Sequence, residues 1–382
     1  MNQKRHKIAI VEANMTGLQH AYPNGVYCTM ISELYGKENI SLYCSNEHLE
    51  AMKIGKVYSR FESLKVVSDD NKMIQKFFVE MKNTFKVIKE TDADIIVFLS
   101  CFPDVQFAIQ LFARFIGTEK KVIIFTHGEL EGLLMPGKWK VWSYPFWISL
   151  CMRHPMPNNV YRIVLGKSIM DNLNKINRDN AVFCIDQPRD NFSTENKVCH
   201  EKGHNIYSFI GDFLEKKGSK TFLDASEKVQ SNSRFMIVGK YHSVNGKSIG
   251  DNVCVCGKNG FIAKDEFDDL IKATTYACYP YPSNSYRLTA SGAVLDAIRF
   301  LKPIIYIAND YFDSIFEGAG NIGYRCVDEA EFIKVIEELD NTDRSIVYNV
   351  QVENLKRLQL KFSQDNVKRQ LKQVLNSIEE NK

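Results

Sequence analysis

The sequence predicts two doubly wound α/β domains of the Rossmann type, with a ligand cleft between them. Short β-branched runs alternate with longer amphipathic helical patterns, which is typical of parallel α/β units. The alternation begins again after a polar stretch without periodicity, and the chain of 382 residues is long enough for two domains of about 100–200 residues each. We therefore expect a first domain over 1–186, a linker over 187–204, a second domain over 205–343, and a C-terminal helix over 344–382 that crosses back onto the first domain.

The first domain is expected to hold a parallel sheet. Its predicted strands are 7–13, 40–44, 94–100, 121–127, 161–166 and 181–185. The runs at 94–100 and 121–127 are almost continuously apolar, as in strands covered on both faces. The clearest amphipathic helical patterns lie at 70–90 and 104–117.

The second domain repeats this organisation. Its predicted strands are 205–211, 234–239, 252–257, 275–280, 303–308 and 322–327. Its predicted helices are 217–230, 265–273, 291–301, 309–316 and 328–340, followed by a long helical pattern at 344–379. Ligands of such sheets bind beside the carboxyl ends of the strands and the N-termini of the following helices.

Charge and hydropathy exclude several classes of protein. The 49 basic and 46 acidic residues leave a net charge of +3, and no dense basic run points to a nucleic-acid partner. No apolar stretch is long enough to span a membrane, and the apolar run before Glu12 is too short for a signal peptide. The ten cysteines often lie within apolar runs, so we expect a cytoplasmic protein with reduced thiols.

The sequence lacks several common metal-binding, nucleotide-binding and hydrolase motifs. Cys254 and Cys256 form a pair, but no second ligand pair follows at the spacing of a zinc site, so no metal site is predicted. The sequence contains neither a Walker lysine loop nor a Gly-x-Ser-x-Gly elbow.

The start of the second domain, "IYSFIGDFLEKKGSKTFLDASEKVQSNSRFMIVG", resembles the nucleotide-binding domain of retaining GT-B glycosyltransferases of the large family four. In that family a strand ends in glycine, an arginine follows, and a Lys-Gly pair opens the helix. Gly211 ends the strand here, Lys217 and Gly218 match the Lys-Gly pair, and Asp212 stands where the arginine is usual.

The segment "GFIAKDEFDDLIKATTYACYPYPSNSYRLTASGAVLDAIRFLKPIIYI" is similar to the donor-binding segment of the same family. The family's Glu-x7-Glu signature is half kept, because Asp296 aligns with the second acid but Leu288 occupies the place of the first. The resemblance covers roughly residues 205–345, and over 1–185 it rests mostly on strand order.

The resemblance implies the GT-B architecture and the transfer of a sugar, with retention, from a nucleoside-diphosphate sugar to a carbohydrate or lipid-linked acceptor. It implies neither a divalent metal nor a cofactor. The composition, rich in Lys, Asn and Ile, suggests a bacterial source, where such enzymes build surface polysaccharides.

Small residues open the helix predicted at 291–301. The backbone N–H groups at Ser291 and Gly292, together with the helix dipole, would bind a phosphate, although an ordinary capped helix is the alternative. Asp296 lies on the next turn and would accept hydrogen bonds from ribose hydroxyls, each worth about 1.5–3 kcal/mol. A solvated carboxylate on the helix surface is the alternative for Asp296.

Positive charge is expected beside the diphosphate. Lys217 matches a phosphate-binding position of the resembling family. The alternative is an ordinary surface lysine, which is how this residue would be interpreted on its own. Asp212 would repel a diphosphate by roughly 3 kcal/mol at about 5 Å, so its carboxylate must point away or be neutralised. Arg287, four residues before Ser291, is the candidate replacement for the family's arginine.

The nucleotide base is expected along the loop that begins at Gly260, where the resemblance implies recognition by main-chain groups. Phe261 and Ile262 would form an apolar wall for the base, or else belong to the core. Tyr279 and Tyr281 are further candidates for lining this pocket.

In the first domain, His127 and Glu129 follow a predicted strand at the edge where α/β proteins place their sites. The resemblance implies that a histidine here contacts the donor sugar near the reacting carbon, whereas a lone histidine is usually structural. In the glycine-containing loop after the first strand, Gly17 is expected to approach the diphosphate or acceptor, and His20 is an acceptor-side candidate.

The three tryptophans, Trp139, Trp142 and Trp147, lie together between basic residues. This combination suits peripheral contact with the inner face of a membrane, and a packed aromatic helix pair is the alternative.

Two other functions stay open. One is a nucleotide-sugar 2-epimerase of the same architecture, which would carry a richer set of acids and histidines. The other is a catalytically silent subunit that binds a sugar nucleotide, since the family's arginine and first acid are missing.

Overall fold

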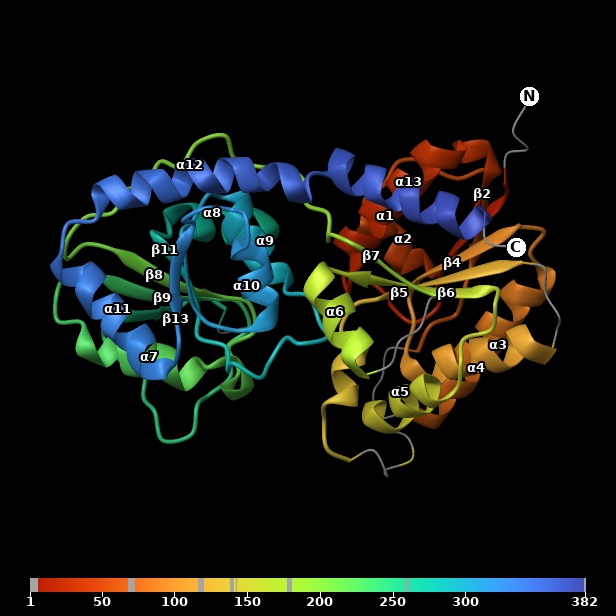
Figure 1. The fold of residues 1–382 in the computed structure, drawn as a ribbon, viewed down its shortest axis with the longest axis horizontal. Coiled ribbons are helices and arrows are strands. Elements are labelled where there is room, and N and C mark those ends of the chain that lie inside the picture. Colours follow the sequence, from red (N-terminus) through yellow and green to blue (C-terminus); the bar gives the residue numbers. More distant parts are fainter. Residues whose placement is uncertain are drawn as a thin grey trace. The chain divides into compact units, whose positions relative to one another are not determined.

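The computed structural model describes residues 6–67, 73–115, 120–137, 141, 143–176, 181–257, 260 and 262–380. The chain divides into two compact units, here called the first and the second unit (Figure 1). The first unit consists of Met1–Pro188, Leu288–Ala290 and Gln364–Lys382. The second unit consists of Arg189–Arg287 and Ser291–Ser363.

The first unit is built on a parallel sheet of seven strands in the order β3-β2-β1-β4-β5-β6-β7. The strands are β1 (Ile8–Glu12), β2 (Ile40–Cys44), β3 (Arg60–Ser63), β4 (Ile95–Ser100), β5 (Lys121–Thr126), β6 (Val160–Leu165) and β7 (Val182–Ile185). The six predicted strands are all present. The sequence did not predict β3, an edge strand with the polar sequence Arg-Phe-Glu-Ser. The strand order reverses between β1 and β4, and this is the switch point where ligands bind in open α/β sheets.

Helices cover both faces of this sheet. They are α1 (Ala21–Tyr35), η1 (Lys37–Asn39), α2 (Asn46–Met52), α3 (Met73–Glu90), α4 (Pro103–Phe115), η3 (Glu129–Leu133), α5 (Tyr144–Arg153), α6 (Lys167–Ile176) and α13 (Gln364–Glu380). Alternate residues of the strands enter two different apolar clusters, because successive side chains of a strand point to opposite faces. One cluster contains side chains of α1 and α13, and the other contains side chains of α3 and α4.

The second unit has a parallel sheet of six strands in the order β10-β9-β8-β11-β12-β13, with its switch point between β8 and β11. The strands are β8 (Ile206–Ile210), β9 (Arg234–Val238), β10 (Val253–Val255), β11 (Tyr276–Tyr279), β12 (Ile304–Ile307) and β13 (Gly323–Cys326). The helices are η4 (Glu215–Lys217), α7 (Ser219–Lys228), α8 (Lys264–Ala273), α9 (Gly292–Arg299), α10 (Asp310–Phe316), α11 (Glu329–Asn341) and α12 (Ser345–Phe362). Figure 1 shows α7 and α11 on one side of this sheet and α8, α9 and α12 on the other.

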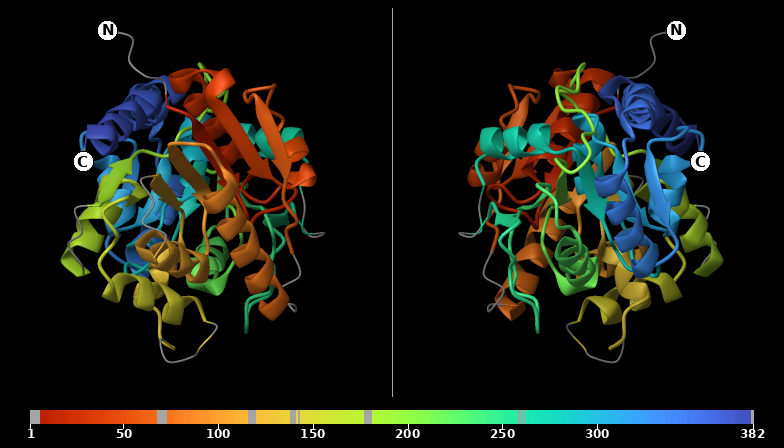
Figure 2. Two further views of the ribbon diagram at one scale, coloured as in Figure 1. Left: turned by 90° about the vertical axis from the view of Figure 1, so that its right-hand side faces the viewer. Right: turned by 90° about the vertical axis from the view of Figure 1, so that its left-hand side faces the viewer.

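The long C-terminal helical pattern forms two helices, because Ser363 between them has extended backbone angles. Helix α12 belongs to the second unit and α13 to the first. Within the first unit, the Tyr35 hydroxyl donates to Glu379, and Lys368 pairs with Glu33 (Figure 2 shows α13 in blue). These contacts fix α13 against α1.

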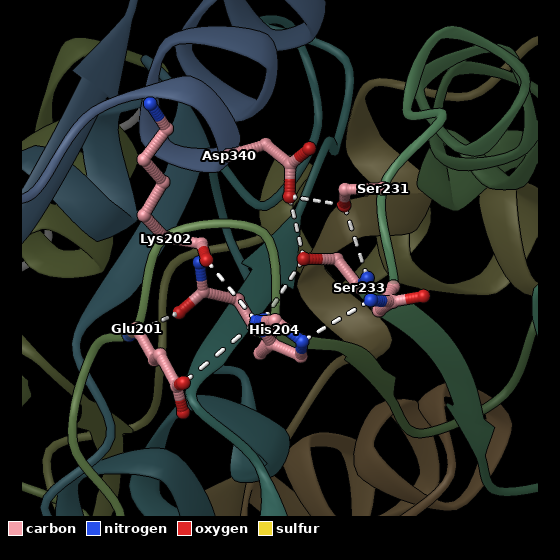
Figure 3. A network of polar contacts seen from close by, with 8 residues as sticks. Glu201, Lys202, His204, Ser231, Ser233 and Asp340 are labelled. Atoms are coloured by element: carbon pink, nitrogen blue, oxygen red, sulfur yellow. Dashed lines mark hydrogen bonds and ion pairs between the residues drawn. The ribbon is translucent and has the colours of Figure 1, made fainter.

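The amino edge of the second sheet carries a polar network that has a structural role (Figure 3). The Asp340 carboxylate on α11 accepts hydrogen bonds from the hydroxyls of Ser231 and Ser233 at 2.9 and 2.5 Å. The Ser233 hydroxyl accepts in turn from the backbone amide of Asn205, just before β8. The network ties α11 to the starts of β8 and β9, at the edge opposite the carboxyl ends of the strands.

Candidate functional site

His127 is the first residue after β5, at the carboxyl edge of the first sheet. Its Nε2 lies 2.7 Å from the carbonyl oxygen of Leu99, which can only accept, so Nε2 carries the proton. Burial lowers the pKa of His127, and the Leu99 carbonyl offsets part of this effect. The ring is therefore neutral at neutral pH, with Nδ1 as a hydrogen-bond acceptor for a hydroxyl group.

Glu129 supports the backbone of the loop that carries His127. Its Oε2 accepts from the amides of His127 and Gly128 at 3.0 and 2.9 Å. Its Oε1 accepts from the Gln106 side chain, and Gln106 accepts in turn from Arg162, which is buried within β6. Burial raises the pKa of Glu129 despite these hydrogen bonds. Since both carboxylate oxygens already accept hydrogen bonds within the unit, the geometry favours a positioning role for Glu129.

The segment Leu288–Ala290 also belongs to the first unit, where it binds the same loop. The Glu131 carboxylate accepts from the amide of Leu288 at 2.7 Å, and the Thr289 hydroxyl donates to the carbonyl of His127 at 3.0 Å. Leu288 itself is buried. The loop 127–131 thus binds the backbone of Leu288 and the side chain of Thr289 within the first unit.

The loop after β1 is held by a buried polar network. The Glu12 carboxylate accepts from the amides of Asn14 and Met15 and from the side chain of Asn24. The Asn24 amide lies 3.0 Å from Nε2 of His48. The Nδ1 of His48 donates to the carbonyl of Gly17, which has a positive φ of 53°. His48 therefore holds the backbone at Gly17, the residue that the sequence predicts to approach the diphosphate or acceptor.

His20 lies next to His127. The two rings pack edge to face with centroids 4.9 Å apart. Burial and the neighbouring His127 lower the pKa of His20 to about 4, so its ring is neutral. His20 has a φ of 55°, an unusual conformation for a non-glycine residue, and its buried Nδ1 has no hydrogen-bond partner among the described residues.

In the second unit, the Lys217-Gly218 turn packs against the end of β11. Gly218 has a φ of 76°, and a Cβ atom there would lie 1.7 Å from the carbonyl oxygen of Pro280, so only glycine fits. The Lys217 ammonium is 6.0 Å from the centroid of the Tyr281 ring. Burial lowers the pKa of Lys217, and Asp212 raises it. The turn thus holds a partly desolvated ammonium at the β8/β11 switch point.

Asp212 and Arg287 are both accessible to solvent. Asp212 is exposed and acts electrostatically on Lys217. Arg287 is half-exposed, with its Nε 3.8 Å from the carboxylate of Asp310. The guanidinium therefore has an acidic neighbour within the second unit.

Helix α9 begins at Gly292, which is exposed, and follows the buried Ser291. Ser291 does not cap the first turn through its side chain. Instead, its hydroxyl lowers the pKa of Tyr281, which burial otherwise raises. The Tyr281 hydroxyl is buried and has no hydrogen-bond partner within the described residues. The start of α9 packs on the end of β8, since a Cβ at Gly211 would lie 3.6 Å from the Cβ of Ala293.

Asp296, on the second turn of α9, forms an ion pair with Arg189. Burial raises the pKa of Asp296, whereas Arg189 and Arg299 lower it. Arg299 in turn binds both carboxylate oxygens of Asp268 at 2.8 and 2.9 Å. The carboxylate predicted to bind ribose is buried and already paired with one guanidinium.

The expected base-binding loop is described in part. The Cδ1 atom of Ile262 lies 3.5 Å from the position that a Cβ of Gly257 would take, and Ile262 is partly exposed. Phe261 lies outside the described residues. Tyr279 and Tyr281 are fully buried in an aromatic cluster, and Tyr279 donates to the carbonyl of Ala293.

The described part of the chain holds no group of three or more His, Cys, Asp or Glu side chains arranged to bind a metal ion. The thiols of Cys254 and Cys256 are 3.7 Å apart on β10 and just after it. Burial and Cys254 raise the pKa of Cys256 to about 12, so this thiol stays protonated.

Trp147 packs within the first unit. Its ring stacks on that of Phe77, with ring centroids 6.1 Å apart, and packs against that of Phe107, with centroids 5.9 Å apart. Trp139 and Trp142 lie outside the described residues. None of the helices in the described ranges is both long and apolar enough to cross a bilayer.

Sequence reasoning missed several polar residues of these networks, namely Glu12, Asn24, His48, Gln106, Glu131, Arg162 and Arg189. Two of them carried a usable signal. Glu12 ends an otherwise apolar strand and Arg162 lies within a mostly apolar one, and buried charges are rare unless they are paired. The other five show their roles only through contacts that are distant in the sequence.

No protein-family model matches this chain, and no curated protein sequence matches it. Solved structures do match. Anabaena HepE in complex with UDP-glucose has a TM-score of 0.65 at 10% identity, covering 97% of this chain and 100% of that chain. The lipopolysaccharide outer core galactosyltransferase WaaB has a TM-score of 0.61 at 12% identity, covering 97% and 99%. The calicheamicin glycosyltransferase CalG4 has a TM-score of 0.52 at 12% identity, covering 98% of both chains. At these identities the likeness establishes the fold, which is the two-domain GT-B fold of these glycosyltransferases.

Proposed function

We propose that this chain is a glycosyltransferase that moves a sugar from a nucleoside-diphosphate sugar to a carbohydrate or lipid-linked acceptor, with retention, in the synthesis of a bacterial surface polysaccharide. The observation that carries the proposal is that the Lys217-Gly218 turn and the start of α9 both lie at the switch point of the second sheet. A Cβ at Gly218 would meet the carbonyl of Pro280 after β11, and a Cβ at Gly211, after β8, would lie 3.6 Å from the Cβ of Ala293. The Lys217 ammonium is partly desolvated, and the first turn of α9 has no side-chain cap. This combination of positive charge and free amides suits a diphosphate.

In the proposed reaction, the bond between the anomeric carbon and the diphosphate breaks while a bond to an acceptor oxygen forms. The diphosphate leaves with an additional negative charge. Lys217, Arg287 and the amides at Gly292 would stabilise that charge electrostatically. The acceptor hydroxyl loses its proton, and an oxygen of the leaving diphosphate takes it up.

His127 is proposed to contact the sugar. Its Nε2 proton is engaged by the Leu99 carbonyl, so Nδ1 is the atom that would accept from a sugar hydroxyl. Its lowered pKa keeps this atom unprotonated at neutral pH. Glu129 would act by holding the backbone of His127 in place. The proposal includes no metal and no resident cofactor.

A thermal-shift panel of nucleoside diphosphates tests the donor site. A ligand at 100 times its dissociation constant stabilises a protein by about 2.7 kcal/mol, which raises Tm measurably. UDP is the first probe because the HepE structure holds UDP-glucose. The matched nucleoside is the control, since it lacks the diphosphate that Lys217 would bind. Unchanged Tm values with UDP, GDP, ADP and dTDP would contradict the proposal.

A nucleotide-sugar 2-epimerase is the second candidate, favoured by the acids and histidines of the first unit. Glu12, Glu80 and His48 are buried, and His20 is partly buried. Incubation with nucleoside-diphosphate sugars separates the candidates. Slow release of nucleoside diphosphate supports the transferase, and a changed sugar on an intact diphosphate supports the epimerase. Binding without either product supports a silent subunit.

A further inference from the structure

The solvent face of α3 has an unusual composition. On the first unit, the exposed positions Ile74, Phe78, Lys82, Phe85 and Lys89 follow one another at helical spacing and form a single stripe, here called the α3 stripe. Ile74, Phe78 and Phe85 are 61%, 63% and 39% exposed. A helix on the surface of a globular protein normally presents polar residues to water on this face.

The stripe continues into a larger aromatic surface. Figure 1 shows α3, α4 and α5 next to one another in the first unit. Phe78 packs on Phe77, which stacks on Trp147 of α5. Tyr144, 44% exposed at the start of α5, packs against Phe102, and the Lys76 ammonium lies 4.4 Å from the Phe102 ring centroid. The exposed side chains of the stripe are therefore backed by packed aromatic rings.

The charge of the stripe is of one sign. Its two charged members are the lysines Lys82 and Lys89, and it contains no acid. Lys86 on the same helix pairs with Glu62. Of the two acids of α3, Glu80 is buried on the inner face, and Glu90 is exposed at the end of the helix, next to Lys89 but outside the stripe. An exposed apolar patch of this kind marks a binding surface, and the lysines identify its partner as anionic.

We propose that the α3 stripe docks on an anionic phospholipid bilayer, with Ile74, Phe78 and Phe85 entering the interface and the two lysines reaching the headgroups. Lysine is depleted from protein–protein interfaces, whereas its long stem lets the ammonium reach lipid phosphates beside inserted apolar side chains. The helix lies in the plane of the interface, as amphipathic helices with aromatic and basic residues do. Docking is independent of the proposed transferase activity.

Vesicle co-sedimentation of the full chain tests this inference. We expect the protein to bind vesicles of phosphatidylcholine mixed with phosphatidylglycerol, to bind pure phosphatidylcholine at least tenfold more weakly, and to dissociate as salt is raised. The double variant Phe78→Ser/Phe85→Ser should lose at least tenfold in partitioning. The double variant Lys82→Gln/Lys89→Gln should lose the preference for anionic vesicles.

The matched control is Ile346→Ser/Leu360→Ser in the second unit, which removes two side chains that are 81% and 71% exposed. We expect this variant to bind vesicles as the wild type does. All variants contain surface substitutions, so their Tm should stay close to that of the wild type. Nucleoside diphosphate binding should be unchanged in the stripe variants, which separates this test from that of the proposed function.

Three outcomes would overturn the inference. The first is wild-type protein that does not bind anionic vesicles, and the second is stripe variants that bind as well as the wild type. The third is a wild-type dimer in sedimentation velocity that becomes monomeric in Phe78→Ser/Phe85→Ser without any vesicle binding, because the stripe would then contact a second copy of the chain.

Discussion

The carboxylate of Glu131 accepts a hydrogen bond from the backbone amide of Leu288, with Oε2 2.7 Å from the amide nitrogen. Leu288 occupies the position at which the resembling family carries its first acid. The chain therefore places a carboxylate from another loop at the backbone of this position. The two residues are 157 positions apart in the sequence, and both belong to the first unit.

The first prediction concerns this contact. Glu131→Ala should leave the buried Leu288 amide without its acceptor, at a cost of about 1.5–3 kcal/mol for a charged hydrogen bond. Hydrogen exchange at the Leu288 amide should then accelerate by about ten- to a hundredfold. Glu131→Gln keeps an acceptor oxygen, so its effect should be smaller. Equal protection of this amide in the wild type and Glu131→Ala would show that the contact contributes nothing.

The second prediction concerns the Lys217-Gly218 turn. Gly218→Ala should destabilise the fold by about 2–4 kcal/mol, because the added Cβ clashes with the carbonyl of Pro280 and the backbone is left-handed. Gly246→Ala is the matched control, since Gly246 has a φ of 72° and nothing within 4 Å of the added Cβ. It should cost only about 1–2 kcal/mol, from the backbone conformation alone. Urea denaturation measures the unfolding free energy of each variant. Equal losses of unfolding free energy in the two variants would show that the clash with Pro280 contributes nothing.

The third prediction uses a buried acid of α3. Burial and the neighbouring acids Asp104 and Glu12 raise the pKa of Glu80 from 4.5 to about 8, while Asn14 and Lys76 lower it. The folded state therefore holds a proton that the unfolded state releases above pH 4.5. The stabilisation from this group is complete below pH 4.5 and is lost as the pH rises through about 8.

Glu80→Gln imitates the protonated form at every pH. Relative to the wild type, its unfolding free energy should be nearly unchanged at about pH 5 and higher at about pH 9, by at most roughly 5 kcal/mol at about 1.4 kcal/mol per pKa unit. Urea unfolding at the two pH values measures the difference. If the unfolding free energies of Glu80→Gln and the wild type differ by the same amount at both pH values, Glu80 is ionised in the folded protein at both.

The sequence predicts the strands well because the parallel strands are buried on both faces. Runs such as Ile95–Ser100 and Lys121–Thr126 contain mostly apolar residues. Strand β3, at Arg60–Ser63, could not be found in this way, because an edge strand exposed to water keeps polar side chains. The sequence does not predict the break between α12 and α13, because it is confined to Ser363 and the helical pattern continues on both sides of this residue.

The candidate site is less predictable. His127 and the start of α9 are visible in the sequence because they follow strands and precede helices. The partners of these groups are distant in the sequence, as with Arg189, which is 107 positions from Asp296. A local pattern shows that a carboxylate is present at Asp296, but not which guanidinium neutralises it.

The fourth prediction therefore separates the two roles of Asp296. If its carboxylate binds ribose, the wild type should prefer the nucleoside diphosphate that gives the largest thermal shift over its 2′-deoxy analogue by about tenfold, from roughly 1.5 kcal/mol for a charged hydrogen bond. Asp296→Ala should abolish this preference. Arg189→Ala removes the ion pair but keeps the carboxylate, so it should retain the preference even though the fold is less stable. Calorimetric titration with both ligands measures the ratio, and discrimination that survives in a folded Asp296→Ala variant would remove Asp296 from the ribose site.

The last prediction concerns Arg287, because the position of the family's arginine holds Asp212 and a diphosphate needs more positive charge than Lys217 supplies. Arg287→Ala should weaken binding of the nucleoside diphosphate by about ten- to a hundredfold, from charged hydrogen bonds of roughly 1.5–3 kcal/mol, and should leave nucleoside binding unchanged. Arg287→Lys keeps the charge but loses the planar fork, so turnover should fall even though part of the binding remains.

Asp310→Asn is the informative partner variant, because the Asp310 carboxylate lies 3.8 Å from the Arg287 guanidinium and competes with the phosphates for it. Removing that charge should tighten diphosphate binding in the wild type and have no effect in Arg287→Ala, since the effect of Asp310 acts through Arg287. Titration calorimetry of the four proteins in this cycle, with the diphosphate and the nucleoside as ligands, measures the coupling. Equal losses for the two ligands in Arg287→Ala would mean that Arg287 supports the fold rather than the diphosphate, and the charge of Lys217 would then act on the leaving group without a second cation.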